Sequence, residues 1–158
     1  MHGGFDEQAL FTAIARSGAR ALLIGRRALV ALGLPVLTAD YDFWLHPDDI
    51  DAFNRALAEV DLAPNRSPEQ ARSVGRYVLE NDDRIDVLVA RQVSTRDGVA
   101  LRFDDAWGRR QRVAYVAGID LQIPSIDDLI LTKRWSLRPK DVDDIELLEA
   151  LKRGQGDT

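Results

Sequence analysis

Three aspartates of this chain lie in apolar segments that otherwise have the pattern of β-strands. Asp40 directly precedes the aromatic segment 41–45, Asp42 lies within it, and Asp86 lies within the apolar segment 84–89. Aspartate is disfavoured in strands, so its presence in two separate segments indicates a chemical role. Side chains alternate between the two faces of an extended segment, which places Asp40 and Asp42 on one face. If the second strand lies beside the first, Asp86 joins them.

Such a group of carboxylates needs a cation. Like charges in a partly dry cleft repel one another and are costly to desolvate unless a cation neutralises them. Mg²⁺ prefers oxygen ligands and completes its octahedral shell with water and substrate phosphates. Two such ions held about 4 Å apart can activate an attacking hydroxyl and stabilise a leaving pyrophosphate oxygen. The sequence therefore predicts a site for two Mg²⁺ ions formed by Asp40, Asp42 and Asp86. In the alternative interpretation, Asp40 is a turn residue and the other two pair with arginines.

A glycine turn precedes the acidic pair. Gly25 separates the apolar segment 21–24 from a helical pattern over 26–32. The free backbone N–H groups at such a helix start favour phosphate. Because one short helix then returns the chain to the acidic segment, the phosphate site and the metal site are expected to adjoin.

The remaining patterns predict the elements that position these residues. Apolar residues at helical spacing predict a helix over 5–15, and another is expected to begin at Pro47 and run towards Val60. Ser125 and Pro139 have the residue types that start helices. Two hairpins are expected, with strands at 76–80 and 84–89 and at 112–116 and 120–123, whereas 62–70 is expected to be a loop. This order predicts an α/β (α+β) fold: a short mixed β-sheet with helices packed against it and a C-terminal helical pair.

Composition narrows the function classes. The chain has 158 residues, 46% of them hydrophobic, which predicts a single domain over 1–153 with a disordered tail over 154–158. A net charge of -5 argues against a general nucleic-acid binder. With no cysteine and only two histidines, a metal site must use oxygen ligands. No apolar run approaches the ~20 residues that cross a bilayer, so no membrane contact and a cytoplasmic location are expected.

The order of these motifs resembles the nucleotidyltransferase superfamily with the DNA polymerase beta-like catalytic core. In that superfamily a strand, a glycine turn and a helix precede a strand with two acidic residues one apart, and a third acidic residue lies on a later strand. Gly25 and Arg26 correspond to the turn, Asp40 and Asp42 to the acidic pair, and Asp86 to the third carboxylate. The resemblance extends over about Ala21 to Leu151, which is most of the chain.

The segment 124–144 resembles the C-terminal helices of bacterial minimal nucleotidyltransferases, including the abortive-infection toxin group. In those relatives the lysine on the first helix approaches the triphosphate, which implies this role for Lys133. At the second turn position, usually small, Arg26 can bind phosphate through its guanidinium. The implied nucleotide-binding residues are Gly25, Arg26, Lys133, Arg138 and Lys140.

The resemblance implies a metal-dependent transfer of a nucleoside monophosphate from an NTP to a hydroxyl of an RNA, protein or small-molecule acceptor. Two Mg²⁺ ions and the NTP donor are the implied cofactors. The toxin relatives imply a toxin–antitoxin setting with a partner protein. The alternative is a catalytically inactive nucleotidyltransferase-like domain that acts as a binding or antitoxin module, because the bulk of Arg26 can crowd the nucleotide out of its usual position.

Other residues have simpler interpretations. The arginines of 109–112 form a basic cluster, interpreted as a solvated loop, with a polynucleotide or partner contact as the alternative. Trp44 is expected in the core, although it shares the face of Asp42, where it can wall the cleft or stack on a base. Asp141 and Asp144 are interpreted as residues that favour a helix start, without a chemical role.

Overall fold

The computed structural model describes residues 6–116 and 118–156 of the chain. The helices are α1 (Glu7–Arg16), α2 (Gly25–Ala31), the 3-10 helix η1 (Pro47–Asp49), α3 (Ile50–Ala58), α4 (Pro68–Val74), α5 (Phe103–Arg109), α6 (Ile126–Lys133) and α7 (Pro139–Gly156). The strands are β1 (Ala21–Ile24), β2 (Asp42–Leu45), β3 (Ala63–Pro64), β4 (Arg76–Glu80), β5 (Arg84–Val89), β6 (Gln92–Ser94), β7 (Ala100–Arg102), β8 (Gln111–Val116) and β9 (Ile119–Ile123).

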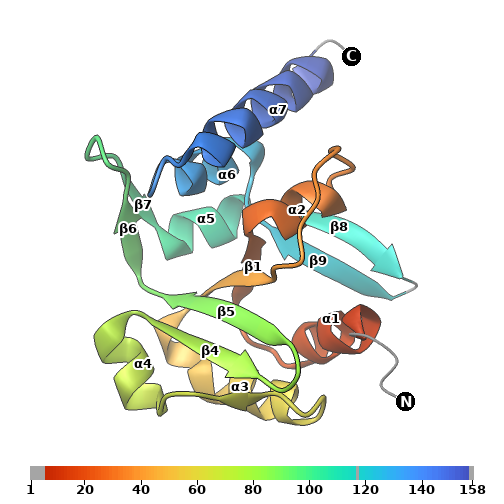
Figure 1. The fold of residues 1–158 in the computed structure, drawn as a ribbon, viewed down its shortest axis with the longest axis vertical. Helices are drawn as coiled ribbons and strands as arrows, with labels where there is room; N and C mark the ends of the chain where they lie inside the picture. The colour runs from red at the N-terminus through yellow and green to blue at the C-terminus, as the bar shows by residue number, and fades with distance from the viewer. Residues whose placement is uncertain (1–5, 117, 157–158) are drawn as a thin grey trace.

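A five-stranded sheet in the order β1-β2-β5-β4-β3 forms the centre of the molecule (Figure 1). β2 and β5 pair in parallel, and the other neighbours pair antiparallel. Two separate hairpins, β6–β7 and β8–β9, complete the strands. The mixed sheet and the α/β class predicted from the sequence are thus confirmed.

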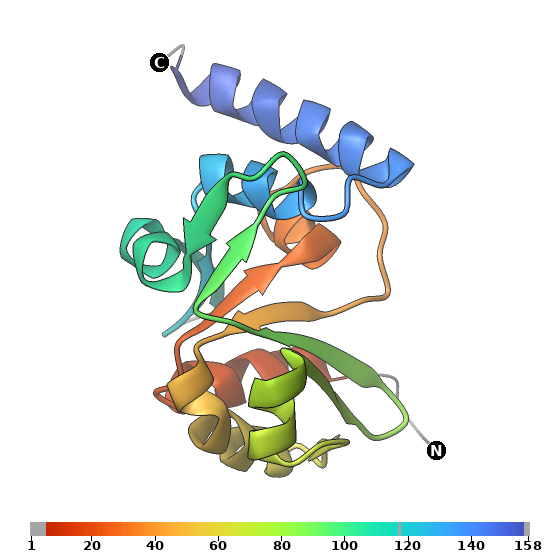
Figure 2. The same cartoon turned by 90° about the vertical axis from the view of Figure 1, so that its left-hand side faces the viewer.

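Helices cover both faces of this sheet. Figure 2 shows α1, α3 and α4 on one side and α5, α6 and α7 on the other. Alternation along the strands supplies each side with its apolar residues: Leu23 and Phe43 pack in the main core, whereas Leu22 and Trp44 pack in a second cluster with Phe103. Each strand therefore offers one face to each helical layer.

The C-terminal helical pair forms as predicted from the sequence. Ser125 caps α6 by accepting a hydrogen bond from the backbone N–H of Asp128. α7 continues through Gly156, so residues 154–156 are helical rather than part of a disordered tail. Residues 157–158 of that tail, and the expected first-helix residue Phe5, lie outside the described residues.

Two regions differ from the sequence-based expectation. The expected loop 62–70 contains the short strand β3 and the start of α4, which is stabilised by a capping box between Ser67 and Gln70. The hairpin β6–β7 was not predicted, because its strands have three residues each and too few alternating positions to show a period. Within the described residues, no helix is long and apolar enough to cross a membrane.

Candidate active site

The parallel pairing of β2 with β5 places two of the three aspartates side by side on neighbouring strands. In its register, Asp42 lies directly opposite Asp86. On the other side of β2, Asp42 pairs with Ile24, the last residue of β1, and Gly25 follows directly. The glycine turn and the two carboxylates therefore lie together at one end of the sheet, as the sequence predicts.

Gly25 is required by its contact with Asp42. The backbone of Gly25 has a positive φ of 69°, which L side chains rarely adopt. A Cβ added at this position would lie 2.7 Å from Oδ2 of Asp42, which is shorter than any normal contact. The Asp42 carboxylate thus fills the space that a side chain at position 25 would take.

Burial and charge both act on Asp42. Burial, together with the charges of Asp86 and Asp40, raises the pKa of this carboxyl to about 6, against the opposing effect of Lys133 and Lys140. Asp42 therefore interacts electrostatically with both other aspartates. Its ionised form is unfavourable in these surroundings, and a bound divalent cation would stabilise it.

Asp40 lies just before β2 rather than within it, and its side chain is exposed. Its backbone is nevertheless anchored. Arg27 donates hydrogen bonds to the backbone oxygens of Asp40 and Thr38, at 3.3 and 3.1 Å, and its guanidinium stacks on the Tyr41 ring at 4.1 Å. α2 thereby fixes the approach of the acidic segment to the sheet.

Asp86 has an arginine partner. Nε and Nη2 of Arg84 donate to one carboxylate oxygen of Asp86 at 3.0 and 2.9 Å, and both side chains are exposed. The arginine pairing considered as an alternative in the sequence is thus present for Asp86. In the part of the chain that the structure describes, no three acidic or imidazole groups are placed closely enough to hold a metal ion as they stand.

The donor set nevertheless fits Mg²⁺. It consists of carboxylate oxygens, and Asp42 is seated against the bare backbone of Gly25 with its charge only partly compensated. The Arg84–Asp86 pair is exposed, and such pairs are weak, so the Asp86 side chain is free to turn at small cost. Asp40, Asp42 and Asp86 are the residues that would hold the ions.

A buried cluster of charges joins α6 and α7 beside these aspartates. Nζ of Lys133 donates to Oδ2 of Asp144 at 2.9 Å, and Arg26 donates to the same oxygen at 3.1 Å. Asp144 is fully buried and Lys133 is 5% exposed, whereas Oδ1 of Asp144 lacks a hydrogen-bond partner among the described residues. The interpretation of Asp144 as a residue without a role beyond starting a helix is wrong. Its pairing could have been inferred from its place on the apolar face of α7, four positions before the buried Leu148.

Asp141 is likewise buried, at 1% exposure, and it anchors the start of α7. Its carboxylate accepts hydrogen bonds from the backbone N–H and the guanidinium of Arg138 and from the Ser136 hydroxyl. Arg138 also interacts electrostatically with Asp42, and Lys140 is exposed near it. Both cations therefore act electrostatically on Asp42, whereas their binding of a triphosphate stays a prediction.

Comparison with solved structures finds proteins of similar fold. No protein-family model matches the sequence, and no curated protein is significantly similar to it in sequence. The lincosamide antibiotic adenylyltransferase LnuA, solved with lincomycin bound, is 15% identical, with a TM-score of 0.61 over 93% of this chain and 98% of its own. The antibiotic-resistance factor ANT(2'')-Ia is 12% identical, with a TM-score of 0.55 over 95% and 90%. The Thermotoga maritima protein TM1012, proposed to be a nucleotidyltransferase, is 13% identical, with a TM-score of 0.54 over 96% and 91%.

The chain has the nucleotidyltransferase fold. At identities this low the likeness establishes the fold alone. Within the nucleotidyltransferase fold, the residues that the sequence singled out at the glycine turn and on the two acidic segments lie together at one end of the sheet.

Trp44 and the basic cluster, the remaining candidates from the sequence, lie away from the aspartates. Trp44 is fully buried, packs edge-on against Phe103 and Trp135, and donates its indole N–H to the backbone oxygen of Ala90, so it does not line a cleft. The basic cluster is divided: Arg109 pairs with the buried Asp128 at 2.9 Å, whereas Arg110 and Arg112 line a cavity elsewhere.

Proposed function

We propose that the protein is a metal-dependent nucleotidyltransferase that moves a nucleoside monophosphate from an NTP to a hydroxyl acceptor. The observation that carries this proposal is the juxtaposition of Asp42 with Asp86 against the bare backbone of Gly25. Carboxylates with surplus charge beside a glycine turn suit a metal-bound triphosphate. The fold shared with LnuA and ANT(2'')-Ia supports the proposal.

The aspartates have distinct roles in this proposal. Asp40 and Asp42 would hold both ions, and Asp86 would hold the ion nearer the acceptor and help to take up the proton of its hydroxyl, while pyrophosphate leaves. Arg84 donates both of its hydrogen bonds to Oδ1 of Asp86, so Oδ2 can contact an ion while this pair is kept. Asp42 must give up any proton it holds, because its pKa lies at about 6. When bound, Mg²⁺ supplies charge stabilisation to the phosphates and lowers the pKa of the attacking hydroxyl.

The cations bind the negative charge of the triphosphate that the metal leaves uncompensated. Lys133 is fixed by Asp144 with its charge acting on Asp42, and Arg138 and Lys140 border the same carboxylates. The backbone N–H groups that follow Gly25 at the start of α2 have no side-chain cap and can donate to phosphate. Arg26 is held by Asp144 and by the backbone oxygen of Leu37, so we assign it to fixing α2 against α7 as well as to the phosphate side.

The acceptor is a hydroxyl of a small molecule, an RNA or a protein. LnuA and ANT(2'')-Ia are described with lincomycin and adenylyl-2''-tobramycin, so a small-molecule acceptor has precedent in this fold. A toxin–antitoxin setting with a partner protein is the second proposal for its context. ATP with Mg²⁺ is the first donor to test, because LnuA is an adenylyltransferase.

A second candidate function is that of a non-catalytic binding module with the same fold. The observation that favours it is the Arg84–Asp86 pair, which neutralises the third carboxylate. Thermal unfolding with Mg²⁺ and each of the four NTPs separates the two. A ligand at a hundred times its Kd raises the free energy of unfolding by about 2.7 kcal/mol, so binding gives a clear increase in Tm, whereas the binding module without a nucleotide site gives none.

The deciding experiment substitutes Asp42. Asp42→Asn keeps the shape of the side chain but removes a charge that both ions require, so transfer from α-labelled NTP to an acceptor in a total extract is expected to fall by at least about a hundredfold. Asp51→Asn changes an exposed carboxylate on α3 in the same way and serves as the control. Transfer that persists in the Asp42 variant at the level of the control excludes this metal assignment.

A further inference from the structure

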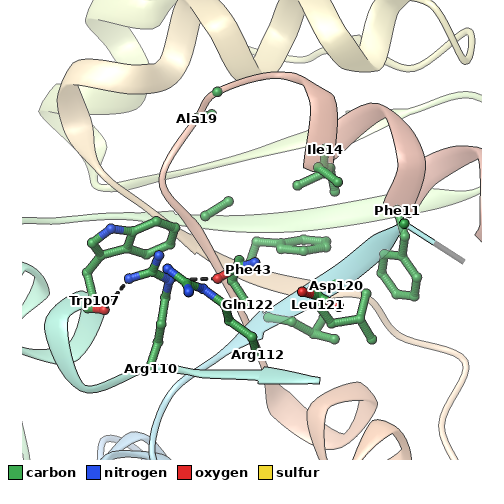
Figure 3. A pocket seen from close by; sticks show the side chains of 15 residues that line it. Phe11, Ile14, Ala19, Phe43, Trp107, Arg110, Arg112, Asp120, Leu121 and Gln122 are labelled. Carbon is green, nitrogen blue, oxygen red and sulfur yellow. Dashed lines mark hydrogen bonds between the residues drawn. The ribbon is translucent and has the colours of Figure 1, made fainter. Parts of the chain in front are cut away.

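A cavity lies on the opposite face of the sheet from the aspartates. It has a volume of about 390 Å³ and lies between α1, β1, β9 and the end of α5. Phe43 lines the cavity (Figure 3), and so does Leu23; both belong to the main core. Because side chains alternate along β2, its residues Asp42 and Trp44 lie on the other face of the sheet. The volume is typical of sites for small organic molecules. The cavity is therefore separate from the candidate active site.

One wall of this cavity is apolar. Phe11 and Ile14 of α1, Phe43 of β2 and Leu121 of β9 line this wall (Figure 3), and Leu23 of β1 also belongs to the lining. Phe11, Leu23, Phe43 and Leu121 are themselves buried in the main core, so their positions are fixed by packing. A ligand with an apolar body finds a preformed surface there.

The other end of the cavity carries two arginines that extend side by side towards Trp107 (Figure 3). Arg110 is firmly oriented: Nε donates to Gln122 at 2.6 Å, Nη1 donates to the backbone oxygen of Trp107 at 2.8 Å, and the guanidinium lies 3.9 Å from the Trp107 ring centre. Nη2 of Arg110 has no hydrogen-bond partner among the described residues. The side chain of Arg112, which lies opposite Gln122 in the β8–β9 register, is exposed and forms no side-chain hydrogen bond or ion pair with a described residue.

Neither guanidinium forms an ion pair with a carboxylate of residues 6–116 or 118–156. Burial and the charge of Arg112 both lower the pKa of Arg110, which means that its positive charge is unfavourable in the empty cavity. Several other arginines of this acidic chain are paired with a carboxylate, for example Arg20 with Asp49 and Arg109 with Asp128. Asp120 lines the cavity too, but it is exposed and forms no ion pair with either arginine in the described part of the chain. An anion bound between the guanidiniums would remove this unfavourable charge.

We propose that this cavity binds a small organic carboxylate, with the anionic head between Arg110 and Arg112 and an apolar body against Phe11, Ile14 and Leu121. Planar carboxylates suit the fork of donors that guanidinium groups present. The stacked Trp107 and the neutral Gln122 hold Arg110 in place without taking its charge, which pre-organises the head-group end.

The test measures binding to the whole chain with two probes and their fragments. Indole-3-acetate and octanoate each combine a carboxylate with an apolar body, whereas acetate and indole each supply only one half. Calorimetric titration is expected to show saturable binding of one or both complete probes and at least about tenfold weaker binding of the fragments. In a ¹⁵N-labelled sample, the indole N–H signal of Trp107, assigned with Trp107→Phe, is expected to shift on binding.

Variants locate the site. Arg112→Gln removes a charge that supports no other contact and is expected to weaken binding by at least about tenfold, a typical effect of losing a charged hydrogen bond. Arg16→Gln removes an exposed charge of the same sign at the end of α1 and should leave the affinity unchanged. Ala15→Leu places a larger side chain at the cavity lining and should also weaken binding.

Each outcome decides the proposal without reference to nucleotide transfer. Absence of saturable binding by both complete probes overturns it. So does equal affinity of the wild type and Arg112→Gln, or binding of acetate as strong as that of the complete probes, since these results indicate a general anion effect. Loss of transfer in Asp42→Asn with retained probe binding would show that the two sites are independent.

Discussion

Asp42 is placed where its ionisation is opposed from several directions. Burial and the neighbouring charges of Asp86 and Asp40 together raise its pKa to about 6. A side chain at position 25 would occupy its space, so the carboxylate has little freedom to move away. A residue held in this way costs stability when it is ionised without a counter-ion, and a bound cation removes that cost.

The stability of the metal-free protein is therefore expected to depend on pH through Asp42. Its pKa in the folded state, about 6, lies above its ordinary value of 3.8, so the folded state takes up a proton first as the pH falls. Ionised Asp42 then lowers the free energy of unfolding above pH 6, by at most about 3 kcal/mol, and this loss disappears as the pH falls towards 4.

Urea unfolding in EDTA at pH 4 to 8 checks this expectation. Asp42→Asn is expected to be more stable than the wild type above pH 6 and equally stable near pH 4. In the wild type, Mg²⁺ binding should weaken as the pH falls below about 6, because the proton competes with the ion. A stability difference that stays constant over the whole pH range would mean that Asp42 has an ordinary pKa.

At the scale of the element, the turn between β1 and α2 depends on Gly25. Gly25→Ala introduces a Cβ 2.7 Å from the Asp42 carboxylate at a φ of 69°. Gly33→Ala, at the other end of α2, is the matched control, because its φ is also positive but nothing lies within 4 Å of the added Cβ. We expect the control to cost about 1 kcal/mol of stability, whereas Gly25→Ala costs more and also abolishes the Mg²⁺-dependent increase in Tm. If the two variants lose the same stability and keep the same Mg²⁺-dependent increase in Tm, the close contact of Gly25 with Asp42 is not needed for ion binding.

The docking of α6 on α7 depends on a buried ion pair. Lys133→Met leaves the fully buried Asp144 with Arg26 as its remaining cation, so we expect a loss of about 3 kcal/mol or more in the free energy of unfolding. Lys152→Met breaks an exposed pair with Asp127 between the same two helices and should cost less than about 1 kcal/mol. Denaturant unfolding of both variants measures the difference, and similar losses would mean that Lys133 is not a structural part of this junction.

The elements near the site show what the sequence contains and what it lacks. β1, β4 and β5 have the predicted bounds, because short apolar runs between clear turn residues are local signals. Parallel pairing of β2 with β5, by contrast, is a long-range property. The sequence could only suggest it because Asp42 and Asp86 are both aspartates in apolar segments with a strand pattern. The capping box at Ser67 was a readable signal for α4 that the polar composition of its surroundings concealed.

The charges of the candidate site were predicted in kind but not in pairing. Lys133 was identified through a resemblance, yet its partner Asp144 was interpreted only as a residue that favours a helix start, and its full burial was not foreseen because aspartate is seldom fully buried. The Arg84–Asp86 contact was considered only as an alternative to metal binding. Ion pairs depend on which elements dock, and a sequence does not state this directly.

For the whole molecule, charge limits the choice of acceptor. A net charge of -5 repels polynucleotides at long range, and Arg109 is already neutralised by Asp128. We expect fluorescence anisotropy with a labelled single-stranded RNA at 50 mM salt to show weak binding, with a Kd above about 10 µM, and a shallow dependence on salt. Tight, strongly salt-dependent binding would instead point to RNA as the acceptor and would remove the preference for a small molecule.

One contact links the beginning of the chain to its end. Arg26 on α2 and Asp144 on α7 are 118 residues apart in sequence, and Asp144 is also the counter-charge of Lys133. In a nascent chain that has not yet reached α7, Arg26 and Lys133 lack Asp144, the carboxylate that pairs with both of them. Translation therefore completes the phosphate end of the cleft last, so truncated products that lack α7 are expected to be both incompletely folded and inert.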